Sequence, residues 1–269
     1  MAENNFSLQK TLTMLLDEKK YHSLRDILST MNPADIAAIF DDLDQACLPL
    51  LFRLLPKELA AETFVEMEPE AQELLIRGFS DSELKEVIDE LYVDDAVDIV
   101  EEMPANVVQR ILSQAEPDMR KQINEILRYP EDSAGSIMTT EYVSLRPNMT
   151  VEEAILRIRR TGIDKETIYT CYVTRGHKLI GLTSVKDLLL CEDDDATIES
   201  IMQEHVITVS TLDDKEQVAQ MFSKYNFLAL PVVDTEDRLV GIVTFDDAMD
   251  VMEDETTEDM EKMAAMLPS

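Results

Sequence analysis

The residues with the clearest potential for chemistry form an acidic stretch near the end of the chain. Nine carboxylates lie between positions 246 and 261, and no Lys or Arg interrupts them before Lys262. Apolar residues recur among them at helical spacing, so the stretch predicts a helix and not a disordered tail. Two carboxylates roughly 5 Å apart repel by about 3 kcal/mol at an effective dielectric near 20. A hard divalent cation would relieve this repulsion, and a simply solvated acidic helix is the alternative.

Two short motifs place a hydroxyl three residues before a carboxylate, GLTSVKD at 181–187 and GIVTFDD at 241–247. This is the spacing of a capping box at a helix start, with Asp in place of the commoner Glu. The same hydroxyl and carboxylate could bind a ribose, while nearby amides and Lys186 would attract phosphate. Two interpretations therefore stay open, a helix cap alone and a nucleotide site.

Both motifs belong to a unit of strands and helices that occurs twice. Met138 corresponds to Met202 at an offset of 64, and Gly181 corresponds to Gly241 at an offset of 60. Each unit predicts a short strand, an amphipathic helix, two apolar strands joined by a turn, and a final helix. One unit alone leaves a sheet face uncovered, so the two are expected to pack as a pseudo-symmetric pair.

A different repeat, with a period of 24 residues, occupies the first half of the chain. Its units start at Asn32, Pro56, Ser80 and Pro104, and apolar residues stand 8, 11, 19 and 23 positions after every start. Such units bury their apolar columns only by stacking on one another. The pattern predicts a superhelix of about five pairs of short helices.

The third unit of this repeat carries carboxylates in unusual places. Eighteen positions after the starts the chain reads Leu50, Leu74, Asp98 and Gln122, and Asp94 shares a helix face with Asp98. These positions could be solvated where the groove widens. They could instead form a carboxylate patch that meets another acidic surface through a bound cation.

The composition narrows the classes of partner. The formal net charge of −32 disfavours nucleic acid and anionic membranes and favours divalent cations or basic partners. Three unpaired cysteines indicate a reducing compartment, and isolated histidines give no support for a zinc site. No apolar run approaches the length of a membrane span, and no motif of a common catalytic class is present, so the chain is not expected to be an enzyme.

The paired units resemble a tandem CBS (cystathionine-β-synthase) module, most clearly in the run PVVDTEDRLVGIVTFDDAMDVM. The helical arm, the run YPEDSAGSIMTTEYVSLRPNMTVEEA and the acidic run EDETTEDMEKMAA together resemble the cytosolic region of MgtE-type magnesium transporters. The resemblance covers essentially the whole chain and implies an α plus α/β fold with a right-handed helical superhelix. It implies an N domain at 1–129, CBS domains at 130–200 and 201–253, and an acidic connecting helix from 254 to 269.

The resemblance also implies a set of magnesium ligands. They lie in the helical arm, the CBS pair and the connecting helix: Asp94, Asp98, Gly135 through its carbonyl, Asp214, Glu216, Asp247, Asp250, Glu255, Glu258 and Asp259. Ser223 and Asn226 stand where some family members have other ligand groups, which puts one peripheral site in doubt.

Some family members bind ATP in the CBS pair, and the resemblance implies matching residues here: Tyr169, Ser184, Lys186, Asp187, Phe227 and Pro231. It further implies a homodimer formed through the CBS domains. A transmembrane pore domain would follow Ser269, so this chain would be the soluble regulatory part of a bacterial inner-membrane protein, on its cytoplasmic face.

These observations combine into one hypothesis of function with two alternatives. In the favoured hypothesis, Mg²⁺ bridges acidic surfaces of the arm, the CBS pair and the connecting helix and holds a pore closed. When magnesium falls, repulsion between these surfaces would open the arm. The alternatives are an adenine-nucleotide-sensing CBS module without magnesium gating and a scaffold whose arm grips a basic partner.

Overall fold

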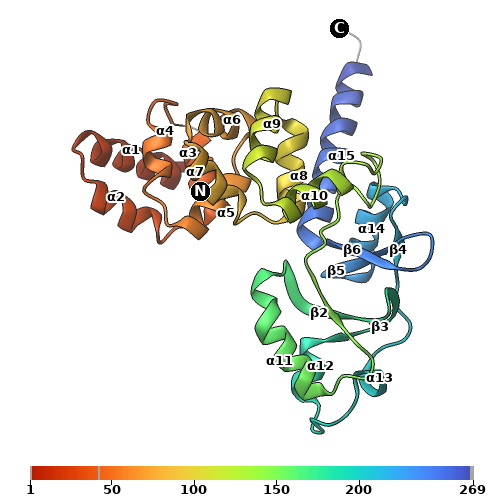
Figure 1. Cartoon of the computed structure of the whole chain (residues 1–269). Coiled ribbons are helices and arrows are strands. Elements are labelled where there is room, and N and C mark those ends of the chain that lie inside the picture. The colour runs from red at the N-terminus through yellow and green to blue at the C-terminus, as the bar shows by residue number, and fades with distance from the viewer. Residues whose placement is uncertain (1, 42, 267–269) are drawn as a thin grey trace. The chain divides into compact units, whose positions relative to one another are not determined.

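The computed structural model describes residues 2–41 and 43–266 (Figure 1). The chain divides into two compact units, residues 1–91 with 95–121 and residues 92–94 with 122–269. The described part of the first unit is built from helices, and the second unit combines helices with two three-stranded sheets. This agrees with the predicted fold class, a helical N-terminal region followed by a CBS pair.

The helical repeat appears as pairs of short helices. Helices α5, α7 and α9 begin at Lys57, Asp81 and Ala105, which reproduces the period of 24 residues. Ser80 and Glu83 form a complete capping box at the start of α7. The helices of this part are α1 (Ala2–Asp17), α2 (Tyr21–Leu28), α3 (Pro33–Asp41), α4 (Leu48–Phe52), α5 (Lys57–Val65), α6 (Pro69–Gly78), α7 (Asp81–Ile88), α8 (Val93–Glu102), α9 (Ala105–Gln114) and α10 (Pro117–Ile126).

The predicted apolar columns form the core of these helix pairs. All four residues of the column that starts with Leu51 are at most 5% exposed, namely Leu51, Leu75, Ile99 and Ile123. Phe40 and Phe64 of another column are equally buried. Packing between successive units therefore supplies the burial that one helix pair lacks.

The column of Asp98 is not part of that core. Leu50, its first member, is 40% exposed, and Asp98 is exposed as well. The sequence pattern treated this column as one that the first two units keep apolar. The structure shows that it lies at the surface, so a carboxylate there displaces no core side chain.

The second unit contains the two predicted CBS units in the predicted order of elements. The first comprises β1 (Tyr142–Leu145), α11 (Val151–Thr161), the 3₁₀ turn Gly162–Asp164, β2 (Thr167–Arg175), β3 (Lys178–Ser184) and α12 (Val185–Leu190). After α13 (Ile198–Ile201), the second comprises β4 (Val209–Ser210), α14 (Lys215–Tyr225), β5 (Ala229–Val233), β6 (Leu239–Thr244) and α15 (Phe245–Met266). In each sheet a parallel pair is followed by an antiparallel pair.

The two CBS units exchange their leading segments. Thr139, which precedes the first unit, pairs with Ile242 of β6, whereas Gln203, which precedes the second, pairs with Leu182 of β3. A Cβ on Gly241 would lie 2.8 Å from the Thr139 carbonyl oxygen, and one on Gly181 would lie 2.9 Å from that of Gln203. Both glycines are therefore required by a close approach of backbone to backbone.

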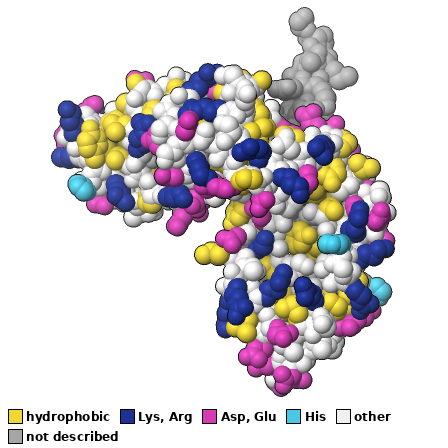
Figure 2. All heavy atoms as spheres, viewed as in Figure 1, with side chains coloured by type: hydrophobic (Ala, Val, Ile, Leu, Met, Phe, Trp, Pro, Cys, Tyr) yellow, Lys and Arg dark blue, Asp and Glu magenta, His cyan; other side chains and the backbone are white. Residues whose placement is uncertain are grey.

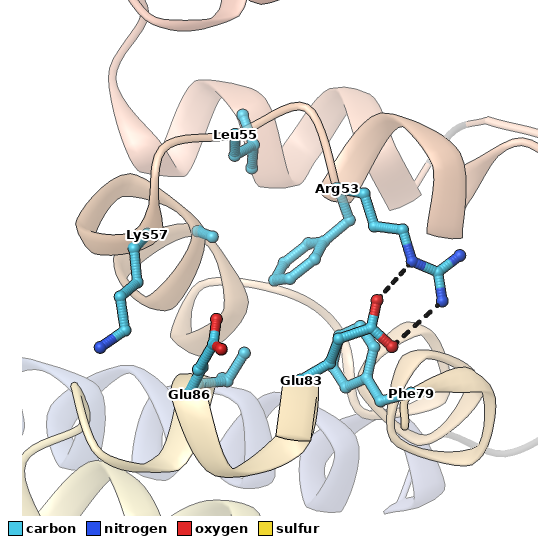
Figure 3. A pocket seen from close by; sticks show the side chains of 9 residues that line it. Arg53, Leu55, Lys57, Phe79, Glu83 and Glu86 are labelled. Carbon is cyan, nitrogen blue, oxygen red and sulfur yellow. Dashed lines mark hydrogen bonds and ion pairs between the residues drawn. The ribbon is translucent and has the colours of Figure 1, made fainter. Parts of the chain in front are cut away.

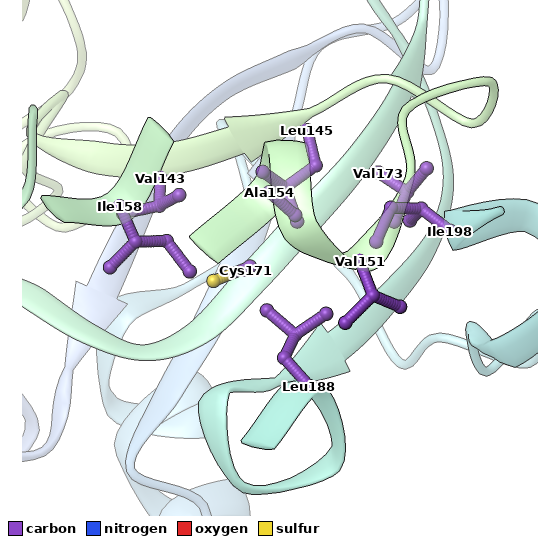
Figure 4. Close-up of a cluster of buried hydrophobic side chains, with 9 residues drawn as sticks. All are labelled: Val143, Leu145, Val151, Ala154, Ile158, Cys171, Val173, Leu188 and Ile198. Carbon is purple, nitrogen blue, oxygen red and sulfur yellow. The ribbon is translucent and has the colours of Figure 1, made fainter. Parts of the chain in front are cut away.

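Each CBS unit has an apolar core, and a smaller cluster joins the two sheets. The core of the first unit collects residues of β1, α11, β2, α12 and α13 (Figure 4). Burial there raises the pKa of the Cys171 thiol to about 12, so this cysteine stays protonated. Between the sheets, the buried Tyr172 ring meets Tyr142 edge-on at 5.9 Å and packs with Ala229 and Ile242.

Helix α15 runs from Phe245 to Met266. It is continuous through position 254, where the sequence was divided between the second CBS domain and a connecting helix. The predicted acidic helix is thus confirmed as a direct extension of the last CBS element. No helix among the described residues is long and apolar enough to cross a membrane.

Candidate metal and nucleotide sites

The carboxylate of Asp247 lies where β6 passes into α15. Its Oδ2 accepts hydrogen bonds from the Thr244 backbone N–H at 3.2 Å and from the Thr244 hydroxyl. Burial raises the pKa of Asp247 to about 6, and repulsion from Asp246 and Asp250 acts in the same direction, while the Thr244 bonds oppose it. Ionisation of this carboxylate is therefore less favourable than that of an ordinary aspartate, and a cation beside it would favour the charged form.

Further carboxylates continue along α15. Asp246, Asp250 and Asp254 are exposed and follow at intervals of four residues, so they line one face of the helix. Glu255 is half-buried. The side chains of Glu258 and Asp259 lie outside the described residues, and their assignment as ligands stays a prediction.

Asp214 and Glu216 lie at the start of α14. The Asp214 side chain is the N-cap of this helix, because Oδ1 accepts a hydrogen bond from the Gln217 N–H at 3.0 Å. Glu216 is exposed in the first turn. Asp214 therefore stabilises the helix whether or not it also binds a metal ion.

The two carboxylates predicted in the arm both belong to α8 but differ in environment. Asp94 is only 5% exposed, whereas Asp98 faces solvent. The expectation that both positions could be simply solvated is therefore wrong for Asp94. Only one of the two offers a carboxylate at the surface.

A carboxylate that sequence reasoning missed meets the first residue of α8. Glu141 Oε2 accepts hydrogen bonds from the Val93 N–H at 3.1 Å and from the Thr139 hydroxyl at 3.0 Å. Burial raises the pKa of Glu141, although both hydrogen bonds act against that rise. No local pattern marks this residue, because its main-chain donor lies 48 positions away.

Gly135, predicted to offer a carbonyl, lies in a buried turn. Its N–H donates to the Thr211 carbonyl at 2.9 Å. A Cβ at this position would lie 2.6 Å from the ring of Tyr129, so only glycine fits the turn. Its assignment as a ligand stays a prediction.

The predicted ligands do not converge within the part of the chain whose side chains are described. There, no three His, Cys, Asp or Glu side chains form a group that could hold a metal ion. Mg²⁺ usually keeps several waters and takes one or two carboxylates, so an ion could still bind to a smaller set. The ligand assignments remain predictions.

The predicted nucleotide residues of the first CBS unit gather around the start of α12. Ser184 and Asp187 form a complete capping box, with the Ser184 hydroxyl 2.6 Å from Asp187 Oδ2. Lys186 and Asp187 are exposed. The β2–β3 register pairs Thr170 with Ser184, which brings the exposed Tyr169 to the same edge.

The two residues predicted from the second CBS unit are less accessible. Pro231 is buried in β5, opposite Ile242 of β6. Phe227 is half-buried, with its ring 5.4 Å from that of Tyr225. A role for Pro231 in a nucleotide site would therefore be to shape its wall. All six nucleotide assignments stay predictions.

Comparison with known proteins decides the family. The model of the MgtE intracellular N domain matches residues 31–132, and the CBS-domain model matches 134–192 and 198–254. A crystal structure of the cytosolic domain of the Mg²⁺ channel MgtE in complex with ATP is 38% identical, with a TM-score of 0.85 over 90% of this chain and 99% of that one. The chain belongs to the MgtE family. The soluble part of a magnesium transporter is also similar, at 33% identity and a TM-score of 0.84.

Full-length MgtE proteins extend the comparison. The magnesium transporter MgtE of Thermus thermophilus is 39% identical over 264 residues, and that of Bacillus subtilis is 31% identical over 255. These matches take in 96% and 94% of this chain but 58% and 56% of the relatives. The chain thus spans a little more than half the length of these relatives, which are magnesium transporters.

Proposed function

We propose that this chain is the magnesium-sensing cytosolic region of an MgtE channel and controls its pore. The observation that supports this most is its similarity to the cytosolic domain of the Mg²⁺ channel MgtE over 99% of that domain. The pore domain and the location at the cytoplasmic face of a bacterial membrane belong to the same proposal.

In the proposed mechanism, Mg²⁺ neutralises carboxylates that repel one another and so favours a compact, closed state. Asp247 supports this, because burial and the neighbouring Asp246 and Asp250 raise its pKa, so a cation beside it would favour the charged form. The proposed ligands are Asp94, Asp98, Gly135, Asp214, Glu216, Asp247, Asp250, Glu255, Glu258 and Asp259. Loss of the ions would shift the population toward an open state by their differential affinity for the two states.

A homodimer through the CBS domains is part of the proposal. Large apolar side chains are exposed on and beside the helices of both CBS units, which is typical of surfaces that bind another protein. They are Leu189 and Leu190 of α12, Leu228 before β5, and Phe245 and Met249 of α15. Analytical ultracentrifugation would test the dimer, and a monomer at all concentrations would contradict it.

ATP binding to the first CBS unit is a second candidate function. It is supported by the exposed Lys186 and Asp187 at a capped helix start and by the ATP complex of the related domain. Nucleotide-dependent stabilisation in the complete absence of divalent ions would favour the adenylate-sensing alternative over magnesium sensing.

The magnesium proposal predicts that millimolar Mg²⁺ compacts and stabilises this chain. Binding to the folded state raises the melting temperature, whereas screening alone acts equally for salts of matched ionic strength. Thermal melting and small-angle scattering with MgCl₂ and with matched KCl would measure the difference. Equal responses to the two salts would remove the case for specific sites.

A double variant tests the arm. Asp94→Asn with Asp98→Asn should make the metal-free form more compact and raise the magnesium midpoint several-fold. Glu58→Gln with Glu62→Gln on α5 is a matched control, since both residues are exposed, four positions apart and lose the same charge. Wild-type scattering by the first variant, with and without Mg²⁺, would exclude the arm from the sensor.

A further inference from the structure

The helical repeat contains a cavity of about 360 Å³ (Figure 3). It is lined from the end of α4, the start of α5 and one side of α7, all within the first compact unit. Five apolar residues and four charged ones line it, namely Phe52, Leu55, Ala60, Phe79 and Val87, with Arg53, Lys57, Glu83 and Glu86. An apolar lining with a few charges at this volume is typical of small-molecule sites.

The 24-residue period explains why the cavity is open at this unit. Four positions after each start the chain reads Ile36, Ala60, Leu84 and Val108. Leu84 is buried in the neighbouring unit, whereas Ala60 supplies a single methyl group at the cavity. A branched side chain is therefore missing where the other three units have one.

The charges at the cavity are unequally matched. Arg53 pairs with Glu83 at 2.6 Å, and this hydrogen bond is the largest cause that lowers the pKa of Glu83 to about 2. Lys57 pairs with Glu90, also at 2.6 Å. Glu86 is exposed and makes no hydrogen bond or ion pair with any residue that the structure describes. Its charge helps to raise the pKa of the Lys57 amine, but its carboxylate oxygens are not used by any described donor.

The neighbouring repeat shows what fits such a place. Arg110 stands 24 positions after Glu86, and its guanidinium donates to the carbonyl of Ile76, to that of Phe79 at 2.6 Å and to Asp81 at 3.2 Å. The carbonyls at the equivalent positions of the cavity are those of Phe52 and Leu55. In the neighbouring repeat, the Arg110 guanidinium thus occupies the space beside the Ile76 and Phe79 carbonyls. In the repeat with the cavity, Glu86 stands at the position of Arg110 and the equivalent space is empty.

We propose that the cavity binds an alkylguanidinium group. The alkyl part would contact Phe52, Ala60 and Phe79, and the guanidinium would pair with Glu86 in a charge-assisted hydrogen bond. The net charge of −32 raises the local concentration of such cations. The group could come from a free small molecule or from an arginine side chain of a partner protein.

The test is a titration of the full chain with low millimolar butylguanidinium chloride, followed by amide NMR shifts. Matched NaCl and the neutral probe 1-butanol are the reference ligands. We expect saturable shifts at Ala60 and Val87 with butylguanidinium only. Glu86→Gln should weaken binding about tenfold. Glu62→Gln, at the same repeat position one unit earlier and outside the lining, should leave it unchanged.

A second variant tests the cavity itself. Ala60→Leu introduces the residue found at this position in the next repeat unit and should abolish binding. If this variant does not fold, the comparison of Glu86→Gln with Glu62→Gln tests the proposal by itself. Glu86-dependent binding of a short arginine peptide, without binding of the free probe, would support the proposal with a protein as the source. Shifts equal to those of NaCl, or equal binding of 1-butanol, would overturn it.

Discussion

The two CBS units share one succession of strands and helices but differ in charge. Residues 134–192 contain eight Lys and Arg against seven Asp and Glu, whereas residues 198–254 contain three against thirteen. On the face drawn in Figure 2, Lys and Arg side chains gather over the first unit, around α11 and α12. One backbone plan can therefore present a surface that tolerates anions and another that attracts cations.

The same contrast appears in the two hydroxyl–carboxylate motifs. At the starts of α12 and α15, the backbone N–H and the hydroxyl of Ser184 donate to Asp187 Oδ2, and those of Thr244 donate to Asp247 Oδ2. Asp187 is exposed beside Lys186, whereas Asp247 is partly buried beside Asp246. Motifs that share these two hydrogen bonds thus place one carboxylate near a cation and the other among like charges, which supports different ligands for the two units.

Substitution of the two glycines at the exchanged leading segments should destabilise the CBS pair most strongly. Gly181→Ala and Gly241→Ala should each lower the free energy of unfolding by about 3 kcal/mol, because the new Cβ would collide with a backbone oxygen. Urea denaturation measures both. Gly78→Ala at the end of α6, where nothing lies within 4 Å, is the control and should not destabilise the chain. If alanine at one of these two positions did not lower the free energy of unfolding, the close backbone approach would be required in only one of the two CBS units.

The charge at Asp247 should make stability depend on pH. Its folded pKa of about 6 lies above the ordinary value near 3.9, so the folded state binds more protons between these limits. The free energy of unfolding should therefore fall as pH rises from about 4 to 6 and be level above that. This fall in the free energy of unfolding should amount to about 2 kcal/mol between pH 4 and pH 6. The variant Asp247→Asn, measured in EDTA, should lack it. Asp187→Asn is the matched control. An equal change in the pH dependence of stability in this variant would contradict the proposed difference between Asp187 and Asp247.

A smaller effect is expected on ligand binding, where the two CBS units should differ in which ligand they bind. Asp187→Ala should weaken ATP binding about tenfold and leave magnesium-induced compaction intact, and Asp247→Ala should do the reverse, as expected for loss of one charged contact. Calorimetric titration with ATP and scattering with Mg²⁺ measure the two responses. Loss of ATP binding in Asp247→Ala, with a normal magnesium response, would reverse the proposed assignment.

Much of the fold could be predicted because its signals are local and periodic. The apolar columns marked the core of the helix pairs, and alternation between turns and apolar runs marked β2, β3, β5 and β6. The capping boxes were equally visible, since their partners stand three residues apart. The candidate ligands were found by charge and family resemblance, and these gave no information on burial.

The sequence by itself determined the two repeats, the acidic helix and the hydroxyl–carboxylate motifs, because each depends on neighbours within a few residues. Only the tertiary structure decided that Asp94 is buried, that Glu141 meets the start of α8, and that Gly181 and Gly241 make room for segments of the opposite CBS unit. It also opened the cavity beside Ala60. These features depend on contacts between residues distant in the chain, where desolvation and steric fit act through packing that no local pattern encodes.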